Sequence, residues 1–185
     1  AKIGAKGTSF TNCHGLHDTA NYTTAYDMYL ITKYAMGLDK YREVVQKTSY
    51  TCEATDTHKQ LIWSSENGLM KRDSVHYYSP VVGGKIGYNS EIGRNVASYA
   101  EYEGFAYYQI DLGAPYELDN GYNQALVDAK NLYMWAFTEF EVKTIVEGGS
   151  QIAEVPLELA WQKNHLNLMI GETYRALLPT DIAVS

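Results

Sequence analysis

A single lysine stands among glycines in the sequence VVGGKIGYNSEIG, residues 81–93, which is typical of the end of a strand. Alternate residues of a strand point to opposite faces, so Lys85 shares its face with Gly83 and Gly87, which have no side chains. Glycine within a strand often marks the close approach of a ligand, and lysine supplies a compact positive charge with three donors. The pattern favours an anion-binding site, and a solvated lysine beside a turn is the alternative interpretation.

A second group of residues, His14, His17 and Asp18, has side chains of the types that bind metals. Metal-binding histidines on a helix stand four residues apart, whereas these stand three apart, with Gly15 between them, in a segment rich in turn residues. We therefore predict no metal site and no cofactor. A metal-dependent hydrolase that uses these three residues stays open only as a further alternative function. His14, Gly15 and Asp18 are expected to be structural, with side chains that hydrogen-bond the backbone of a long irregular loop.

The other candidate nucleophiles and bases form no recognisable catalytic pair. Ser64 and Ser65 lie in WSSENG, which has neither a G-x-S-x-G elbow nor a nearby histidine to activate a hydroxyl. His58, His76 and His165 have no evident partners in the sequence. Each is therefore interpreted as a surface or core residue.

Composition narrows the class of protein. The chain has 185 residues, of which 45% are hydrophobic, enough for one domain and an appendage. A formal charge of −7 without a cluster of Lys and Arg argues against nucleic acid as a partner, and an anionic small ligand would need a local positive pocket. No apolar run approaches the ~20 residues that cross a bilayer. Cys13 and Cys52 lack the spacing of a zinc or redox motif, and a disulfide between them stays open.

The hydrophobic periodicity indicates mixed helices and strands. The expected elements are a helix over 25–36, a helix over 39–48 with Asp39 as its cap, brief strands over 49–55 and 59–65, strands over 79–87, 95–100 and 105–112, a helix over 124–140, and an all-β tail. The short linkers between the three central strands predict antiparallel hairpins. The helix that follows has a broad apolar stripe and is expected to pack on that sheet.

Two long segments resemble one enzyme family. TSFTNCHGLHDTANYTTAYDMYLITKYAM, residues 8–36, is similar to the H-G-L-H/D block of serine-type D-alanyl-D-alanine carboxypeptidases, the low-molecular-mass penicillin-binding proteins of the peptidase S11 kind. GGKIGYNSEIGRNVASYAEYEGFAYYQIDLGA, residues 83–114, resembles the G-x-K-T-G strand pair of the same family. The order, the spacing and the helix that follows also fit, so that the resemblance covers roughly residues 1–145.

The resemblance implies an acyl-enzyme mechanism on bacterial peptidoglycan stem peptides that end in D-Ala-D-Ala. In the family, the serine of an S-x-x-K motif attacks the peptide carbonyl, the lysine of that motif is the base, an S-x-N motif assists proton transfer, and the lysine of K-T-G holds the terminal carboxylate. By this resemblance Lys85 and Gly87 match K-T-G and would bind the substrate, together with Ile86 at the middle position. The same family implies a hydrolase of the cell wall, located outside the cytoplasm.

The chain also departs from the family pattern. It contains no S-x-x-K, so it has no catalytic nucleophile of the family's kind, and Ser65-Glu66-Asn67 spells S-x-N only after the block that should follow it. Ile86 replaces the threonine of K-T-G and offers no donor. Two interpretations follow: a carboxypeptidase fragment that lacks its serine half and is inactive alone, or a degenerate relative that binds peptidoglycan or a partner without cleaving it.

The expected architecture is an α/β (α+β) fold of the penicillin-binding and β-lactamase-like kind, with an antiparallel sheet, packed helices and a missing N-terminal part. Residues 1–145 are predicted to form the C-terminal part of the carboxypeptidase-like domain, and residues 146–185 a small β-rich domain. The abrupt start without methionine is interpreted as a processed or truncated end. Missing strands would expose a sheet edge, which predicts a companion N-terminal polypeptide or a homodimer, and β-lactam binding if the serine half is present.

Overall fold

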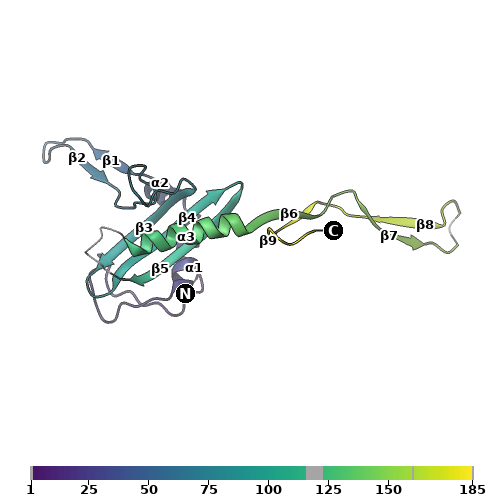
Figure 1. Ribbon diagram of the computed structural model, residues 1–185, viewed down its shortest axis with the longest axis horizontal. Helices are drawn as coiled ribbons and strands as arrows, with labels where there is room; N and C mark the ends of the chain where they lie inside the picture. The colour runs from purple at the N-terminus through teal and green to yellow at the C-terminus, as the bar shows by residue number, and fades with distance from the viewer. Residues whose placement is uncertain (1, 116–122, 160, 185) are drawn as a thin grey trace. The chain divides into compact units, whose positions relative to one another are not determined.

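The computed structural model describes residues 2–115, 123–159 and 161–184 (Figure 1). Its contacts divide the chain into two compact units, residues 1–134 and 135–185. The elements in chain order are α1 (Ala25–Met36), α2 (Asp39–Val45), β1 (Ser49–Cys52), β2 (Leu61–Ser64), β3 (Val81–Asn89), β4 (Gly93–Tyr102), β5 (Phe105–Ala114), α3 (Gln124–Glu139), β6 (Phe140–Val146), β7 (Gln151–Pro156), β8 (His165–Met169) and β9 (Tyr174–Pro179).

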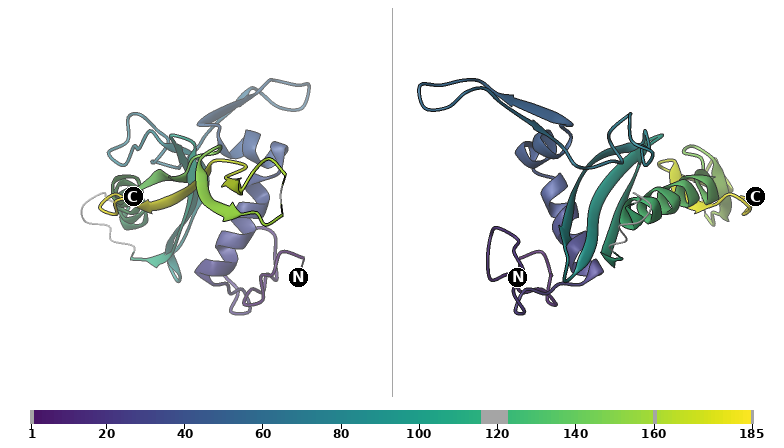
Figure 2. Two further views of the ribbon diagram at one scale, coloured as in Figure 1. Left: turned by 90° about the vertical axis from the view of Figure 1, so that its right-hand side faces the viewer. Right: turned by 60° about the vertical axis from the view of Figure 1, so that its left-hand side comes forward.

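The first unit is built on an antiparallel sheet of order β3-β4-β5, with α1 and α3 on opposite faces (Figure 2). On one face, Tyr29 of α1 meets Tyr108 of β5 edge-on, with ring centroids 5.7 Å apart. On the other face, the buried Tyr133 of α3 hydrogen-bonds Ser98 of β4 at 2.9 Å. The antiparallel hairpins, the packed helix and the α/β fold class are confirmed. Among the strands that the structure describes, β3 and β5 are the edges of this sheet.

Helix α1 begins and ends where the sequence predicts. The side chain of Thr24 accepts a hydrogen bond from the backbone N–H of Asp27 at 3.1 Å, and Gly37 follows the last turn. Asp27 is buried and its carboxylate accepts from the N–H of Gly7 at 2.6 Å and from the hydroxyl of Thr8 at 2.7 Å. The helix therefore anchors the start of the long loop that precedes it.

Helix α2 leads into the β1–β2 hairpin, whose two strands are antiparallel. The sequence places Asp39 at the cap of this helix, and that expectation is wrong: Asp39 lies in the first turn, and Leu38 at the cap makes no side-chain hydrogen bond. An acidic residue in the first turn still interacts favourably with the positive end of the helix. The sequence therefore predicted correctly that Asp39 lies at the start of this helix, and it placed the cap one residue too late.

The second unit is all-β after the end of α3, as predicted for the tail. Strand β6 pairs with β9, and β7 pairs with β8, both antiparallel. The predicted domain boundary near Val146 remains a prediction, whereas the contacts divide the chain after Met134, inside α3. Apart from Ala136, the buried hydrophobic residues among those described all belong to the first unit, so that is where the core lies.

A candidate anion-binding groove beside the edge strand

Lys85 lies in the middle of edge strand β3, opposite Ala97 of β4. A Cβ added to Gly87 would meet no atom within 4 Å, so the main chain there is open. Gly83 differs, because a Cβ there would lie 3.1 Å from the side chain of Val45 and 3.7 Å from that of Met36. The expectation that both glycines leave room for a ligand is therefore wrong for Gly83, whose missing side chain makes room for the helices.

The exposed Lys85 lines a groove of about 720 Å³ in the first unit. Three segments form its walls: α2 with the turn after it, the two strands of the β1–β2 hairpin with residues 65–67, and β3. The half-buried Ile86 also lines this groove, and the Lys85 ammonium contacts the carbonyl oxygen of Ile86. The structure thus puts the lysine beside a hollow large enough for a peptide.

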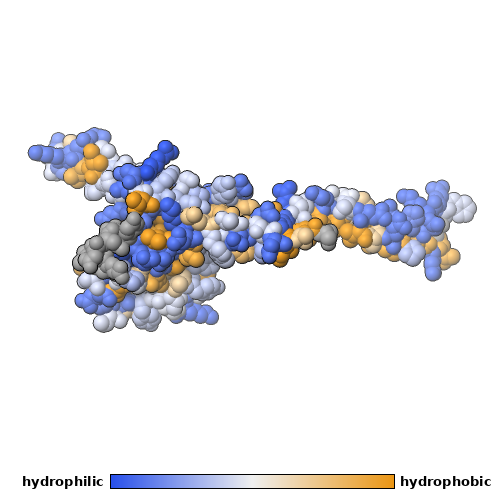
Figure 3. Space-filling view, in the orientation of Figure 1, coloured by the Kyte–Doolittle hydropathy of each residue, from blue (hydrophilic) through white to orange (hydrophobic). Residues whose placement is uncertain are grey.

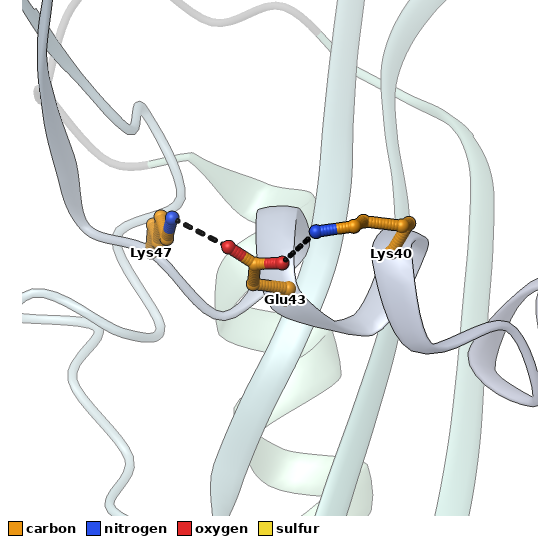
Figure 4. Close-up of polar contacts among 3 residues, drawn as sticks. All are labelled: Lys40, Glu43 and Lys47. Atoms are coloured by element: carbon orange, nitrogen blue, oxygen red, sulfur yellow. Dashed lines mark hydrogen bonds and ion pairs between the residues drawn. The ribbon is translucent and has the colours of Figure 1, made fainter.

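The charges along this groove are mainly positive. Three lysines line it, Lys40, Lys47 and Lys85, against two glutamates, Glu43 and Glu66. Figure 4 shows that Glu43 lies between two of the lysines: its carboxylate is 3.0 Å from the ammonium of Lys40 and 3.1 Å from that of Lys47. The hydrogen bond from Lys40, and then that from Lys47, lower the pKa of Glu43. A chain with a net charge of −7 therefore contains the local positive pocket that an anionic ligand needs.

The hairpin contributes an aromatic wall that the sequence analysis missed. Tyr50 and Trp63 are cross-strand partners whose rings are nearly parallel, with an interplanar angle of 7° and centroids 6.1 Å apart. The ammonium of Lys47 lies 5.4 Å from the centroid of the Tyr50 ring. The exposed Leu61 and Ile62 make the hairpin hydrophobic at a place where its surroundings are hydrophilic (Figure 3). The signal in the sequence was the alternation in SYTC and LIWS, which puts Tyr50 and Trp63 on one face.

Comparison with known families matches residues 1–115 to peptidase S11, D-alanyl-D-alanine carboxypeptidase. The chain belongs to this family. The D-alanyl-D-alanine carboxypeptidase DacA of Haemophilus influenzae is 29% identical over 154 residues, which cover 83% of this chain and 36% of that protein. DacA of Escherichia coli K12 is 28% identical over 179 residues, covering 97% of this chain and 38% of that protein.

Solved structures show the same fold. Penicillin binding protein 5 from Haemophilus influenzae has a TM-score of 0.66 at 25% identity, over 97% of this chain and 48% of that one. The D-alanyl-D-alanine carboxypeptidase DacD from Francisella tularensis has a TM-score of 0.67 at 16% identity, over 97% and 53%. The chain therefore spans about half the length of these structures, and less of the curated relatives.

Ser65-Glu66-Asn67, which matches the S-x-N motif of the S11 family only in its letters, lines the groove. The hydroxyl of Ser65 accepts a hydrogen bond from the N–H of Asn67 at 3.2 Å. The side-chain oxygen of the buried Asn67 in turn accepts from the N–H of Leu69 at 3.1 Å. Both side chains therefore shape the turn after β2, which is a structural use of these residue types.

The loop of the H-G-L-H block is held by its own side chains. His14 Nδ1 accepts from the N–H of Leu16 at 3.1 Å, and the N–H of Gly15 donates to Asn12 at 2.9 Å. Asp18 accepts from the N–H of Ala20 at 2.8 Å, and this bond is the main reason that the pKa of Asp18 is lowered. These contacts are of the kind that the proposed structural role requires.

Two further expectations concern metals and cysteines. Within residues 2–115, 123–159 and 161–184, no three His, Cys, Asp or Glu side chains gather closely enough to hold a metal ion. Cys13 and Cys52 are both free thiols, so the disulfide left open by the sequence is not formed. In the described part of the chain, no helix is both long enough and apolar enough to cross a membrane.

Proposed function

We propose that this chain supplies the carboxylate-binding part of a D-Ala-D-Ala carboxypeptidase that acts on peptidoglycan stem peptides. One observation carries the proposal: in a member of the S11 family, Lys85 lies on an edge strand and lines a positively charged groove. A charge-assisted hydrogen bond from an ammonium to a carboxylate is about twice as strong as a neutral one. Lys85 would therefore hold the terminal carboxylate of the peptide, with Ile86 beside it.

The strand itself offers the second part of the binding site. Because β3 is an edge strand, a peptide in extended conformation can lie along it and use main-chain hydrogen bonds. The open space at Gly87 lets that peptide approach the backbone closely. Lys85 then fixes the end of the peptide and β3 fixes its direction.

Cleavage would require a nucleophile from outside these residues, because the chain contains no S-x-x-K. A companion N-terminal polypeptide would supply the serine and its base, and would make the complete site a target of β-lactams. Strand β5, the other edge of the sheet, offers unpaired backbone groups for such a partner. We place this activity outside the cytoplasm, at the cell envelope, where peptidoglycan lies.

The alternative is a relative that binds peptidoglycan or a partner and cleaves nothing. One observation favours it: Ile86 lines the groove at the position where the K-T-G motif has a threonine, and isoleucine offers no hydroxyl there. Covalent labelling by a fluorescent penicillin of the complex between this chain and its companion separates the two functions. A labelled serine supports the carboxypeptidase, and reversible peptide binding without any label supports the alternative.

Calorimetric titration tests the role of Lys85. We expect an N-acetylated tripeptide that ends in D-Ala-D-Ala to bind the wild type, and Lys85→Ala to weaken binding about tenfold, the loss of one charge-assisted hydrogen bond. The same peptide with a C-terminal amide should bind both proteins equally weakly, because it lacks the carboxylate.

The matched control is Lys59→Ala, which removes an exposed lysine from the connection between β1 and β2, outside the groove. This variant should bind the acid and the amide as the wild type does. Equal affinity of wild type and Lys85→Ala for the free acid would remove Lys85 from the site.

A further inference from the structure

The groove has a second cationic position, where α2 and the turn after it line the groove. Lys40 and Lys47 share the carboxylate of Glu43, so this cluster keeps a net positive charge. In the proposed function, Lys85 binds one anionic group of the ligand, the terminal carboxylate. Lys40 and Lys47 have no role in that proposal. A ligand that fills the groove would bring its own charges against them.

Lys47 is the better placed of the two. Its ammonium is restrained from two sides, by Glu43 at 3.1 Å and by the ring of Tyr50 at 5.4 Å from the centroid. Its side chain is 42% exposed, compared with 93% for Lys40. A restrained ammonium loses less side-chain entropy when it binds a ligand. An ammonium also has three donors, so Lys47 keeps donors for a ligand after its bond to Glu43.

The groove also has apolar walls. Val44 and Val45 follow the α2 side, and the aromatic pair of the hairpin and Ile86 complete the lining. Such walls suit aliphatic parts of a ligand, whose burial is favourable in proportion to the apolar area removed from water. The arrangement fits an extended chain with an anionic group at its end, an apolar stretch, and a second anionic group further along.

We infer that Lys47 is a specificity-determining residue of this groove, and that its ligand is a peptide with a second carboxylate several residues before the terminal one. The inference rests on the proposed function, since it takes the terminal carboxylate to be at Lys85. Glu43 is then a positioning residue, which holds the Lys47 ammonium at the wall of the groove. A peptide whose second carboxylate is amidated would bind less tightly.

The test uses pairs of N-acetylated hexapeptides that end in D-Ala-D-Ala and carry either Glu or Gln at the third, fourth or fifth residue from the C-terminus. Successive residues of an extended chain are ~3.3 Å apart, so the three positions scan the length of the groove. At one position, we expect the wild type to bind the Glu peptide about two- to fivefold more tightly than the Gln peptide, the range for an exposed ion pair.

Three variants make the result specific. Lys47→Ala should abolish the preference for Glu, whereas Lys40→Ala, which removes a lysine bonded to the same Glu43, should keep most of it. Lys85→Ala should weaken both peptides of a pair and leave their ratio unchanged. Equal loss of the preference in Lys40→Ala and Lys47→Ala would overturn the assignment to Lys47.

The two proposals fail in different ways. If wild type binds Glu and Gln peptides equally at all three positions while Lys85→Ala weakens both, the inference about Lys47 is wrong and the terminal carboxylate site stands. If no peptide binds, or if Lys85→Ala has no effect, the proposed function fails and the inference fails with it. Raising the salt concentration should reduce the preference for Glu, because exposed ion pairs are screened.

Discussion

At the scale of single residues, two residues of the same type can have different structural roles in this chain. Gly83 and Gly87 share a face of β3, yet the first makes room for Val45 and the second leaves the backbone open. Sequence spacing could predict that both share a face with Lys85, because a strand alternates. It could not predict that the space beside Gly83 is filled, because this depends on α2, which lies much earlier in the chain.

The burial of His76 makes the stability of the protein depend on pH, which can be tested. It is 7% exposed, and its Nε2 accepts a hydrogen bond from the N–H of Asn123 at 3.4 Å. Burial first, and then the charge of Lys130, lower the pKa of His76 below the usual 6.5. Below about pH 6.5 the unfolded chain therefore binds more protons than the folded one, so stability falls as the pH falls.

We expect the variant His76→Asn to lose less stability than the wild type when the pH falls. The free energy of unfolding, measured with urea at pH 7.5 and pH 5.5, should fall less between the two pH values in His76→Asn than in the wild type. His58→Asn is the control, because His58 is only half-buried, in the connection between β1 and β2, and this variant should behave as the wild type. An equal decrease in wild type and His76→Asn would show that other groups cause the pH dependence.

At the scale of elements, the sequence predicted α1 to the residue and most of the strands to within two or three. Strong local signals explain this: Thr24 and Gly37 mark the ends of α1, and short linkers determine the pairing of β3, β4 and β5. The groove could be predicted only in part. The glycines around Lys85 marked this residue in the sequence as a candidate. Lys47 and Tyr50 join the groove only when α2 and the hairpin pack beside β3, so their place in it could not be predicted.

The N-cap of α1 gives a prediction at this scale. Thr24→Ala removes the side-chain acceptor for the N–H of Asp27 and should reduce the free energy of unfolding by about 1 kcal/mol. Thr24→Ser keeps the hydroxyl and should remain close to the wild type. Urea denaturation of the three proteins at pH 7.5 measures the difference, and a serine variant as unstable as the alanine variant would assign the effect to the lost methyl group.

At the scale of the whole molecule, the two units differ in how much they bury. The first unit contains the core between its sheet and helices, whereas strands β7 and β8 of the second expose all of their residues. The sheet of the first unit also ends in β5, which has no neighbour on one side among the described strands. Unpaired edge strands of this length tend to associate with another chain.

Self-association through β5 is therefore expected, and sedimentation over a range of concentrations measures it. Leu112→Lys puts a charge on a partly exposed position of β5 and should shift the equilibrium toward monomer, because charged side chains discourage edge pairing. Leu132→Lys, on an exposed position of α3, is the matched control and should associate as the wild type does. A wild type that stays monomeric throughout would leave only the companion polypeptide as the partner of this edge.

The pair of rings on the hairpin gives the protein an optical probe of its own. The indole of Trp63 is about half exposed and faces the same hollow as Lys85, so any molecule that settles there displaces water from the ring. Tryptophan emission depends on the polarity around the indole, and the two other tryptophans of the chain lie at positions 135 and 161, both beyond the first unit. Ligand binding in the groove can thus be followed as a change in the wavelength and intensity of tryptophan fluorescence. Trp63→Phe is the control variant, whose fluorescence should not respond to the ligand.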